Sequence, residues 1–139
     1  RMREECSRIS SLFLTSIEKL MLDSNYLSKL PGWLLSLGQL KSLSLDDNQL
    51  TSLPDHIGNC SSLEHLSANH NYIRVIPTDV RYLSQLKRLL LSYNQIGRVE
   101  RDTLGGLDKL EVIGLTHCRL KQVPTWLTLR MQSLRHLYL

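Results

Sequence analysis

The sequence predicts an α/β solenoid, in which short strands stack into a parallel β-sheet on the concave face and short helical or irregular segments form the convex face. Two observations predict this architecture. A pattern of apolar residues closed by Asn returns between Ile17 and Leu139, and successive copies start 23 or 24 residues apart. A fixed period of this length is typical of stacked supersecondary units. Each unit is too small to bury its own apolar face, so its stability depends on its neighbours.

Each copy of the pattern spans nine residues, with apolar residues at its first, fourth and sixth positions and Asn at its ninth. Five full units start at residues 17, 40, 63, 86 and 110, and a partial sixth starts at 134. We expect residues 1–16 to form an N-terminal cap or flanking helix, because a terminal unit needs a polar cover. The pattern stops in mid-strand at Leu139, so we expect the chain to be a fragment of a longer protein. A disordered tail is the alternative.

The first half of each unit predicts a short strand. In the second unit Leu43 and Leu45 alternate with Ser42 and Ser44. Successive side chains of a strand point to opposite faces, so the leucines are expected in the core and the serines on the concave surface. Stacking the units in register puts neighbouring strands about 4.8 Å apart. The exposed column that contains Ser42 comprises Lys19, Ser42, His65, Arg88, Val112 and His136.

The Asn position closes each strand and predicts a structural ladder. The chain turns after the strand, which leaves backbone N–H and C=O groups without partners in the sheet. A buried Asn amide both donates and accepts, so stacked Asn residues satisfy these groups. Cys in the same position acts as a small hydrophobe with a weak donor. The ladder comprises Asn25, Asn48, Asn71, Asn94 and Cys118.

The second half of each unit predicts the convex side. All four prolines directly follow the second of two apolar positions that we expect to face inward. Proline fixes φ and lacks an N–H, which suits an ordered bend. Glu100 replaces proline in the fourth unit, which is one residue longer and contains Gly105-Gly106, so we expect a different convex segment there. The inward columns comprise Leu27, Leu30, Leu50, Leu53, Ile73, Ile76, Ile96, Val99, Leu120 and Val123.

The repeated pattern resembles the leucine-rich repeat family over residues 17–139, nearly the whole chain. The 23-residue units and their Leu-Pro step are similar to the intracellular Ras-group scaffolds of that family. The resemblance implies a non-catalytic module that binds a protein partner and takes part in signalling. Any catalytic activity would lie in domains outside this chain. The resemblance also implies an intracellular, cytoplasmic location.

The cysteines and the hydropathy agree with that location. The three cysteines form no C-x-x-C motif, and no cysteine-rich cap flanks the repeats. Extracellular repeats of this kind usually close their ends with disulfides, so a reducing compartment is favoured. The sequence contains no run of about 18 apolar residues, so we expect no insertion into a membrane.

Charge is distributed unevenly along the chain. The net charge is +4, which divides into +1 over residues 1–15, −3 over residues 16–72 and +6 over residues 73–139. The basic half permits nucleic-acid binding, specifically to RNA, as an alternative function. Against it, one exposed column alternates basic residues with Glu instead of forming a basic stripe. We interpret this column as a ladder of ion pairs that supports the sheet. It comprises Glu18, Lys41, Glu64, Lys87, Glu111 and Arg135.

The concave face is the candidate site for a protein partner of unknown identity. The exposed columns place an aromatic and basic patch over the later strands, and an acidic patch that includes Asp46 and Asp47 over the earlier ones. Tyr and Arg are residue types that are enriched at binding hot spots. The patch over the later strands comprises His65, His70, Arg88, Leu90, Tyr93, His117, His136 and Tyr138. Asn69 is a further residue of the concave face that we expect to contact the partner.

The sequence predicts no cofactor, no metal site and no catalytic residue. His70 and His117 share a column but lie two strands apart, about 9 to 10 Å at the strand spacing, with Tyr93 between them. No Cys or carboxylate completes a zinc set with them. We find no nucleophile elbow and no Gly-rich phosphate loop. A structural docking subunit of a large assembly is a further alternative function, and the oligomeric state stays open.

Overall fold

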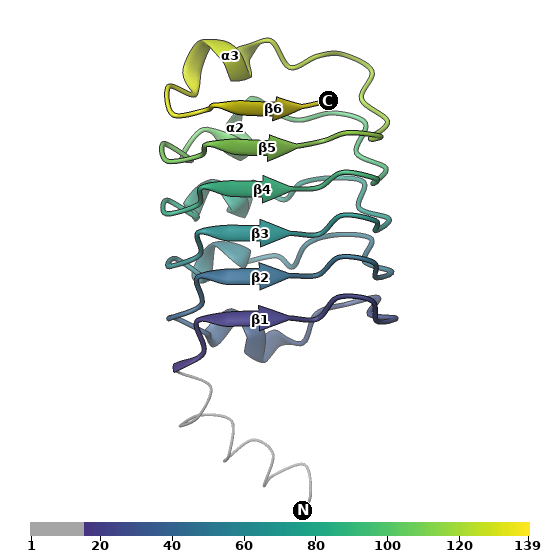
Figure 1. The fold of residues 1–139 in the computed structure, drawn as a ribbon, viewed down its shortest axis with the longest axis vertical. Coiled ribbons are helices and arrows are strands. Elements are labelled where there is room, and N and C mark those ends of the chain that lie inside the picture. The colour runs from purple at the N-terminus through teal and green to yellow at the C-terminus, as the bar shows by residue number, and fades with distance from the viewer. Residues whose placement is uncertain (1–15) are drawn as a thin grey trace, which may run out of the picture.

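The structure, a computed structural model, describes residues 16–139. Within this range six short strands stack in chain order into one parallel sheet, from β1 at one end to β6 at the other (Figure 1). The predicted solenoid is therefore confirmed. The cap expected over residues 1–16 lies outside the described residues, apart from Ser16. The strands are β1 Lys19–Met21, β2 Ser42–Ser44, β3 His65–Ser67, β4 Arg88–Leu90, β5 Val112–Gly114 and β6 His136–Tyr138.

The sheet register follows the period of the sequence. Leu43 on β2 pairs with Leu20 on β1 and with Leu66 on β3, and Leu89 on β4 pairs with Leu66 and with Ile113 on β5. Leu43, Leu66 and Leu89 are at most 1% exposed. A slip of one residue would turn every leucine of this column to solvent, so its burial fixes the register.

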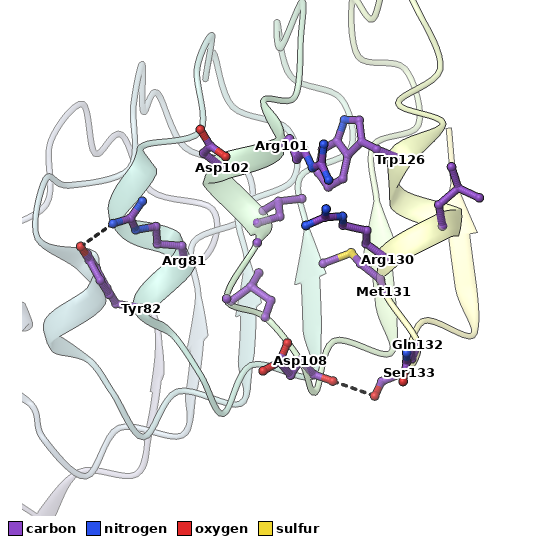
Figure 2. A pocket seen from close by; sticks show the side chains of 15 residues that line it. Arg81, Tyr82, Arg101, Asp102, Asp108, Trp126, Arg130, Met131, Gln132 and Ser133 are labelled. Atoms are coloured by element: carbon purple, nitrogen blue, oxygen red, sulfur yellow. Dashed lines mark hydrogen bonds between the residues drawn. The ribbon is translucent and has the colours of Figure 1, made fainter.

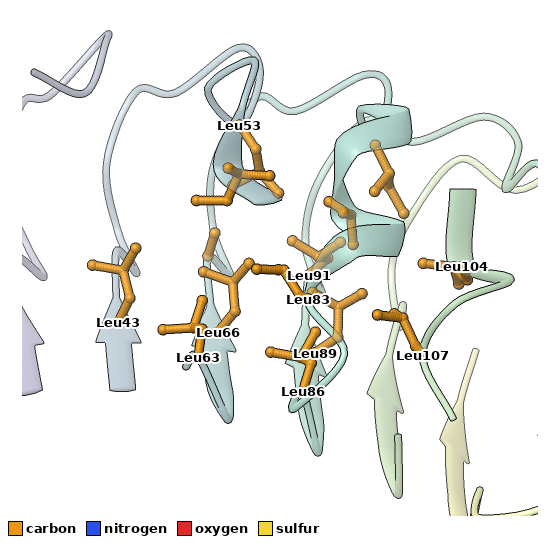
Figure 3. Close-up of a cluster of buried hydrophobic side chains, with 14 of the residues drawn as sticks. Leu43, Leu53, Leu63, Leu66, Leu83, Leu86, Leu89, Leu91, Leu104 and Leu107 are labelled. Carbon is orange, nitrogen blue, oxygen red and sulfur yellow. The ribbon is translucent and has the colours of Figure 1, made fainter. Parts of the chain in front are cut away.

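The core lies between the sheet and the convex segments. Figure 3 shows strand leucines such as Leu66 and Leu89 in one cluster with convex-side leucines such as Leu53 and Leu83. All four are at most 1% exposed. Burial of a large apolar side chain contributes about 1.5–3 kcal/mol. Because the cluster runs continuously from unit to unit, each unit is stabilised mainly by its neighbours.

The convex segments differ with the length of the unit. The 23-residue units contain 3₁₀ turns, which are η2 Gly32–Ser36, η3 Ile57–Asn59 and η4 Thr78–Tyr82. The 24-residue units contain short α-helices, which are α2 Arg101–Leu104 and α3 Trp126–Arg130. An α-helix holds about 3.6 residues per turn and a 3₁₀ helix about 3.0, so the wider turn absorbs the extra residue. The different segment expected in the fourth unit is confirmed, and the fifth unit shares it.

Each convex turn begins at the position that proline occupies in four of the units. The Pro31 carbonyl accepts a hydrogen bond from the Leu34 N–H at 3.1 Å. The Glu100 carbonyl accepts one from the Thr103 N–H at 3.2 Å, and the Glu100 backbone is extended like that of Pro31. The turn therefore needs a residue in the extended conformation whose carbonyl can accept this hydrogen bond. Proline favours that conformation, and Glu100 also adopts it.

Two expectations about burial are wrong. Val123, expected to face inward, is 60% exposed, because it belongs to the last full unit and only β6 follows that unit in the described chain. Val112, expected on the exposed face, is only 8% exposed. It pairs with Arg88 on one side and His136 on the other, and their longer side chains flank it.

Candidate binding surface

The exposed face of the sheet, called here the strand face, corresponds to the predicted concave surface. Arg88 on β4 pairs with His65 on β3, and Val112 separates Arg88 from His136 on β6. The side chains of His65, Arg88 and His136 are exposed. Over residues 16–139 no ion pair or side-chain hydrogen bond engages the Arg88 guanidinium. Arg88 is therefore a cation available to a partner.

The charged column forms separate ion pairs rather than a continuous ladder. Lys41 Nζ lies 3.0 Å from Glu18 Oε1, and Lys87 Nζ lies 2.7 Å from Glu64 Oε2. No ion pair joins these two pairs to each other, or Lys87 to Glu111, in the described part of the chain. The hydrogen bond from Lys87, together with its charge, lowers the pKa of Glu64, and the same contact raises the pKa of Lys87.

Another column of the strand face forms a hydrogen-bonded ladder that the sequence analysis missed. Asp23 Oδ1 accepts from the Ser44 hydroxyl and from the Asp46 N–H at 2.9 Å. Asp46 Oδ1 accepts from the Asn69 N–H at 2.7 Å, and Asn69 Oδ1 accepts from the Ser92 N–H at 2.8 Å. Each side chain therefore satisfies a backbone N–H of the next unit just beyond its strand. The signal was a column of short acceptor side chains, which are the residue types that bond to nearby backbone.

This ladder changes how the predicted acidic patch is understood. The carboxylate of Asp46 is engaged by three hydrogen-bond donors, including the Ser67 hydroxyl and the Asn69 side-chain amide. Asp46 and Asn69, both predicted to contact a partner, therefore have a role inside the sheet. Asp47 lies outside the ladder and is exposed.

The residue before each ladder Asn adopts a left-handed backbone conformation. The φ angles are 55° at Ser24 and Asp47, 53° at His70, 57° at Tyr93 and 54° at His117. This region costs a residue with a Cβ about 1–2 kcal/mol. The backbone N–H groups of the first four donate to carbonyls of the next unit, which stabilises the conformation. None of the five residues is a glycine, although Asp and His are among the residue types enriched in the left-handed region.

The left-handed backbone aligns three aromatic side chains along one edge of the strand face. The ring centroids of His70 and Tyr93 lie 4.2 Å apart with planes inclined by 10°, and those of Tyr93 and His117 lie 4.5 Å apart at 26°. Stacked pairs of this kind contribute about 0.5–1.5 kcal/mol each beyond their burial. Tyr93 remains 46% exposed, so the row presents a preformed aromatic edge to solvent. We call His70, Tyr93 and His117 the aromatic row.

The remaining predicted contact residues lie around this row. His136 and Tyr138 on β6 have ring centroids 6.3 Å apart with nearly parallel planes, and Tyr138 is 52% exposed. Leu90 on β4 is half-buried. The strand face thus presents Arg88 and the aromatic row over its later strands, with the β6 aromatics at its end.

The Asn ladder has the hydrogen bonds that the pattern predicts. Asn71 is 5% exposed, and its Oδ1 accepts from the Leu50 N–H at 2.9 Å. Its Nδ2 donates to the Leu45 carbonyl of the preceding unit at 2.9 Å. Asn48 and Asn94 make equivalent contacts. Asn25, at the start of the described chain, is exposed and donates only to local carbonyls.

Cys118 takes the Asn position in the fifth unit with a weaker version of the same contact. Its Sγ donates to the Leu91 carbonyl at 3.2 Å. Burial raises the pKa of the Cys118 thiol, although backbone contacts from Asn94 and Ile96 lower it. Burial also raises the pKa of Cys60, which lies in the core. Both thiols are therefore held in the protonated, poorly nucleophilic form.

Over residues 16–139 no three His, Cys, Asp or Glu side chains are grouped closely enough to hold a metal ion. No helix in the same range is long and apolar enough to cross a membrane.

Comparisons with known proteins identify the family. The leucine rich repeat family profile matches residues 15–73, 69–120 and 84–139, so the chain belongs to the leucine-rich repeat family. A solved structure of an internalin from Listeria monocytogenes str. 4b F2365 is similar to this chain, with 25% sequence identity and a TM-score of 0.76. The match covers 88% of this chain and 35% of the internalin chain. No curated protein matches this chain.

The family defines a general role. Leucine-rich repeat domains generally mediate protein–protein interaction, and the internalin-like fold is typically a non-catalytic binding module. Repeat stacking explains this role, because it produces an extended surface from equivalent positions of successive units.

Proposed function

We propose that this chain is a non-catalytic module that binds a protein partner through the strand face of β3–β6. The aromatic row is the observation that carries the proposal. Three aromatic side chains are held in fixed positions by the backbone and by one another, and the central ring of Tyr93 remains 46% exposed. Rigid aromatic groups lose little conformational entropy on binding, which makes them effective anchors.

Arg88 supports the same location for the contact. Its guanidinium is exposed on β4 and has no ion-pair partner within the described chain. Next to it, Lys87 is paired with Glu64 and is therefore less available. A guanidinium with no ion-pair partner in the described chain offers a partner carboxylate a bidentate contact on the same strand face as the aromatic row.

The proposal gives different roles to the two ends of the strand face. On the later strands Arg88, the aromatic row and the β6 aromatics Tyr138 and His136 would contact the partner. On the earlier strands Asp47 would contribute charge at the rim. Asp46 and Asn69 would act indirectly, by holding the turns that position their neighbours. We propose an intracellular location, because the 23-residue units and their Leu-Pro step resemble those of the intracellular Ras-group scaffolds.

Affinity purification of the full-length protein from its own cells tests the proposal. The test variant is Arg88→Ala/Tyr93→Asn, because Asn tolerates the left-handed backbone that Tyr93 adopts. The matched control is Tyr26→Asn/Lys29→Ala, which also removes one tyrosine and one cation. Tyr26 is 88% exposed, and both control residues lie outside the aromatic row.

We expect a specific partner to be lost with the test variant and kept with the control, while both variants melt cooperatively. If both variants retain the same partners as the wild type, the strand face is not the contact surface. Loss of partners with both variants would mean that the effect is not specific to this surface, and would also contradict the proposal.

A further inference from the structure

A groove of about 900 Å³ lies on the convex side, between η4, α2 and α3. Figure 2 shows the side chains of Arg101 and Arg130 beside the indole ring of Trp126, with Met131 close to Arg130. Leu104 and Leu107 form part of the wall and are at most 2% exposed. The groove therefore combines two cations with an apolar and aromatic surface.

The two guanidiniums have no partner of their own. Neither Arg101 nor Arg130 takes part in an ion pair or a side-chain hydrogen bond within residues 16–139. Arg81 lines the same groove but is already engaged, because its Nη2 donates to the Tyr82 hydroxyl at 2.9 Å. Free guanidiniums beside a groove favour carboxylate or phosphate ligands.

Glycine shapes the groove by allowing a close approach of the backbone. A Cβ on Gly106 would lie 2.2 Å from the Arg81 carbonyl oxygen, a distance that no side chain tolerates. Gly106 therefore allows the segment after α2 to pack against η4. Gly106 and Arg81 both line the groove, so this packing shapes part of its wall.

Trp126 also lines a second hollow, of about 660 Å³. Its lining includes Arg74, Arg98 and Lys121. Arg98 Nε lies 2.9 Å from Glu100 Oε1, so one of these cations is neutralised within the chain. Trp126 thus lines two basic hollows. Within residues 16–139 the first contains two guanidiniums without a side-chain partner, those of Arg101 and Arg130, and the second contains one, that of Arg74. We call Trp126, Arg101, Arg130 and Met131 the convex groove site.

We propose that the convex groove site docks an acidic segment of a protein partner, independently of the strand face. Carboxylates of the segment would contact Arg101 and Arg130, and a neighbouring apolar side chain would pack on Trp126 and Met131. An acidic peptide fits better than a nucleic acid. Asp102 lines the same groove, together with Asp108, and would repel a continuous phosphate backbone. A peptide can place its charges away from these carboxylates, whereas the phosphates of a nucleic acid follow one another along its whole backbone.

The test uses the fluorescence of Trp126 in the full chain. Trp126 and Trp33 are the two tryptophans of the sequence, so Trp33→Phe leaves Trp126 as the single reporter. The probe is a seven-residue peptide with a central phenylalanine, one glutamate on each side of it and serine at the other four positions. The control probes are the same peptide with lysines in place of glutamates, and decauridylate.

The test variant is Arg101→Gln/Arg130→Gln in the Trp33→Phe background. The matched control is Lys19→Gln/Lys29→Gln, which removes the same charge from exposed positions outside the groove. We expect the glutamate peptide to shift Trp126 emission and to bind the test variant about tenfold more weakly per lost guanidinium, which corresponds to about 1.4 kcal/mol each. The lysine control should bind like the wild type.

Three results would overturn the proposal. Equal weakening in both double variants would indicate a general charge effect. No change in Trp126 emission at saturation would place the peptide elsewhere. Tighter binding of decauridylate than of the glutamate peptide, with a shift in Trp126 emission, would make the groove a nucleic-acid surface instead. None of these results bears on Arg88 or the aromatic row, so this proposal and that for the strand face can fail separately.

Discussion

Asn71 offers the most direct test of how the repeat is stabilised. Its side chain makes four hydrogen bonds, to the Leu50 N–H and to the carbonyls of Leu45, Ala68 and Asn69. Each of the three carbonyls also accepts from another donor. The Leu50 N–H is different, because Asn71 Oδ1 is the acceptor that the described structure provides for it. Asn71→Ala would therefore leave the buried Leu50 N–H without an acceptor, and would remove one of the donors from each of the three carbonyls.

The expected loss of stability follows from these contacts. An unpaired buried donor costs about 1–3 kcal/mol, and a typical net hydrogen bond contributes about 0.5–1.5 kcal/mol. We therefore expect Asn71→Ala to lower the free energy of unfolding by about 2–4 kcal/mol. Asn25→Ala is the matched control, because Asn25 occupies the same pattern position but is exposed and donates only to local carbonyls. Water replaces those contacts, so its cost should stay below about 1 kcal/mol.

Urea denaturation followed by circular dichroism measures both values. Asn71→Asp adds a second check, because the carboxylate keeps the acceptor for the Leu50 N–H but places negative charge against three carbonyl oxygens. At pH 7 Asn71→Asp should be at least as destabilising as Asn71→Ala. Equal losses for Asn71→Ala and Asn25→Ala would refute the argument that burial and the contact between units give the ladder its stability.

Two further predictions follow from the close contacts of the fold. Gly106→Ala should destabilise the protein by at least about 1–3 kcal/mol through overpacking. Gly105→Ala, whose Cβ would lie 3.4 Å from the Arg101 carbonyl oxygen, should be nearly neutral in thermal melts. A cost shared by both glycines would contradict this explanation. Glu64→Gln should be less stable than the wild type at neutral pH because it loses the contact with Lys87. The pKa of Glu64 is lowered from 4.5, so its contribution is present above that pH and lost as the pH falls through the folded-state pKa. The gap between the two melting temperatures should therefore close in acid, and a gap that persists in acid would rule out the carboxylate as its source.

Register and core were predictable from the sequence because they repeat. The spacing of 23 and 24 residues placed Leu43, Leu66 and Leu89 in one column, and the structure pairs and buries them in that order. The extra residue of the fourth unit predicted a different convex segment, which is the α2 helix. The Asn column was predictable for the same reason, since one residue type in a fixed position must serve one backbone geometry.

The candidate site was predictable only in part. The columns correctly placed Tyr93 between His70 and His117, but nothing in the spacing indicated that the three rings stack at 4.2 and 4.5 Å. The stack depends on positive φ angles that no glycine marks. Likewise, the columns presented Asp46 and Asn69 as exposed polar residues, and their hydrogen bonds to the next unit appear only once the turns are placed in space.

The sequence by itself determined the solenoid, its register and its apolar core, because each of these depends on a residue pattern that recurs at a fixed period. The tertiary structure decided which polar side chains are free. Within residues 16–139 Arg88, Arg101 and Arg130 have no side-chain partner and Lys87 has one, although all four are basic residues of the same half of the chain. The physical reason is that pairing depends on distances of a few ångströms between side chains of different units, and the period fixes only where the backbones lie.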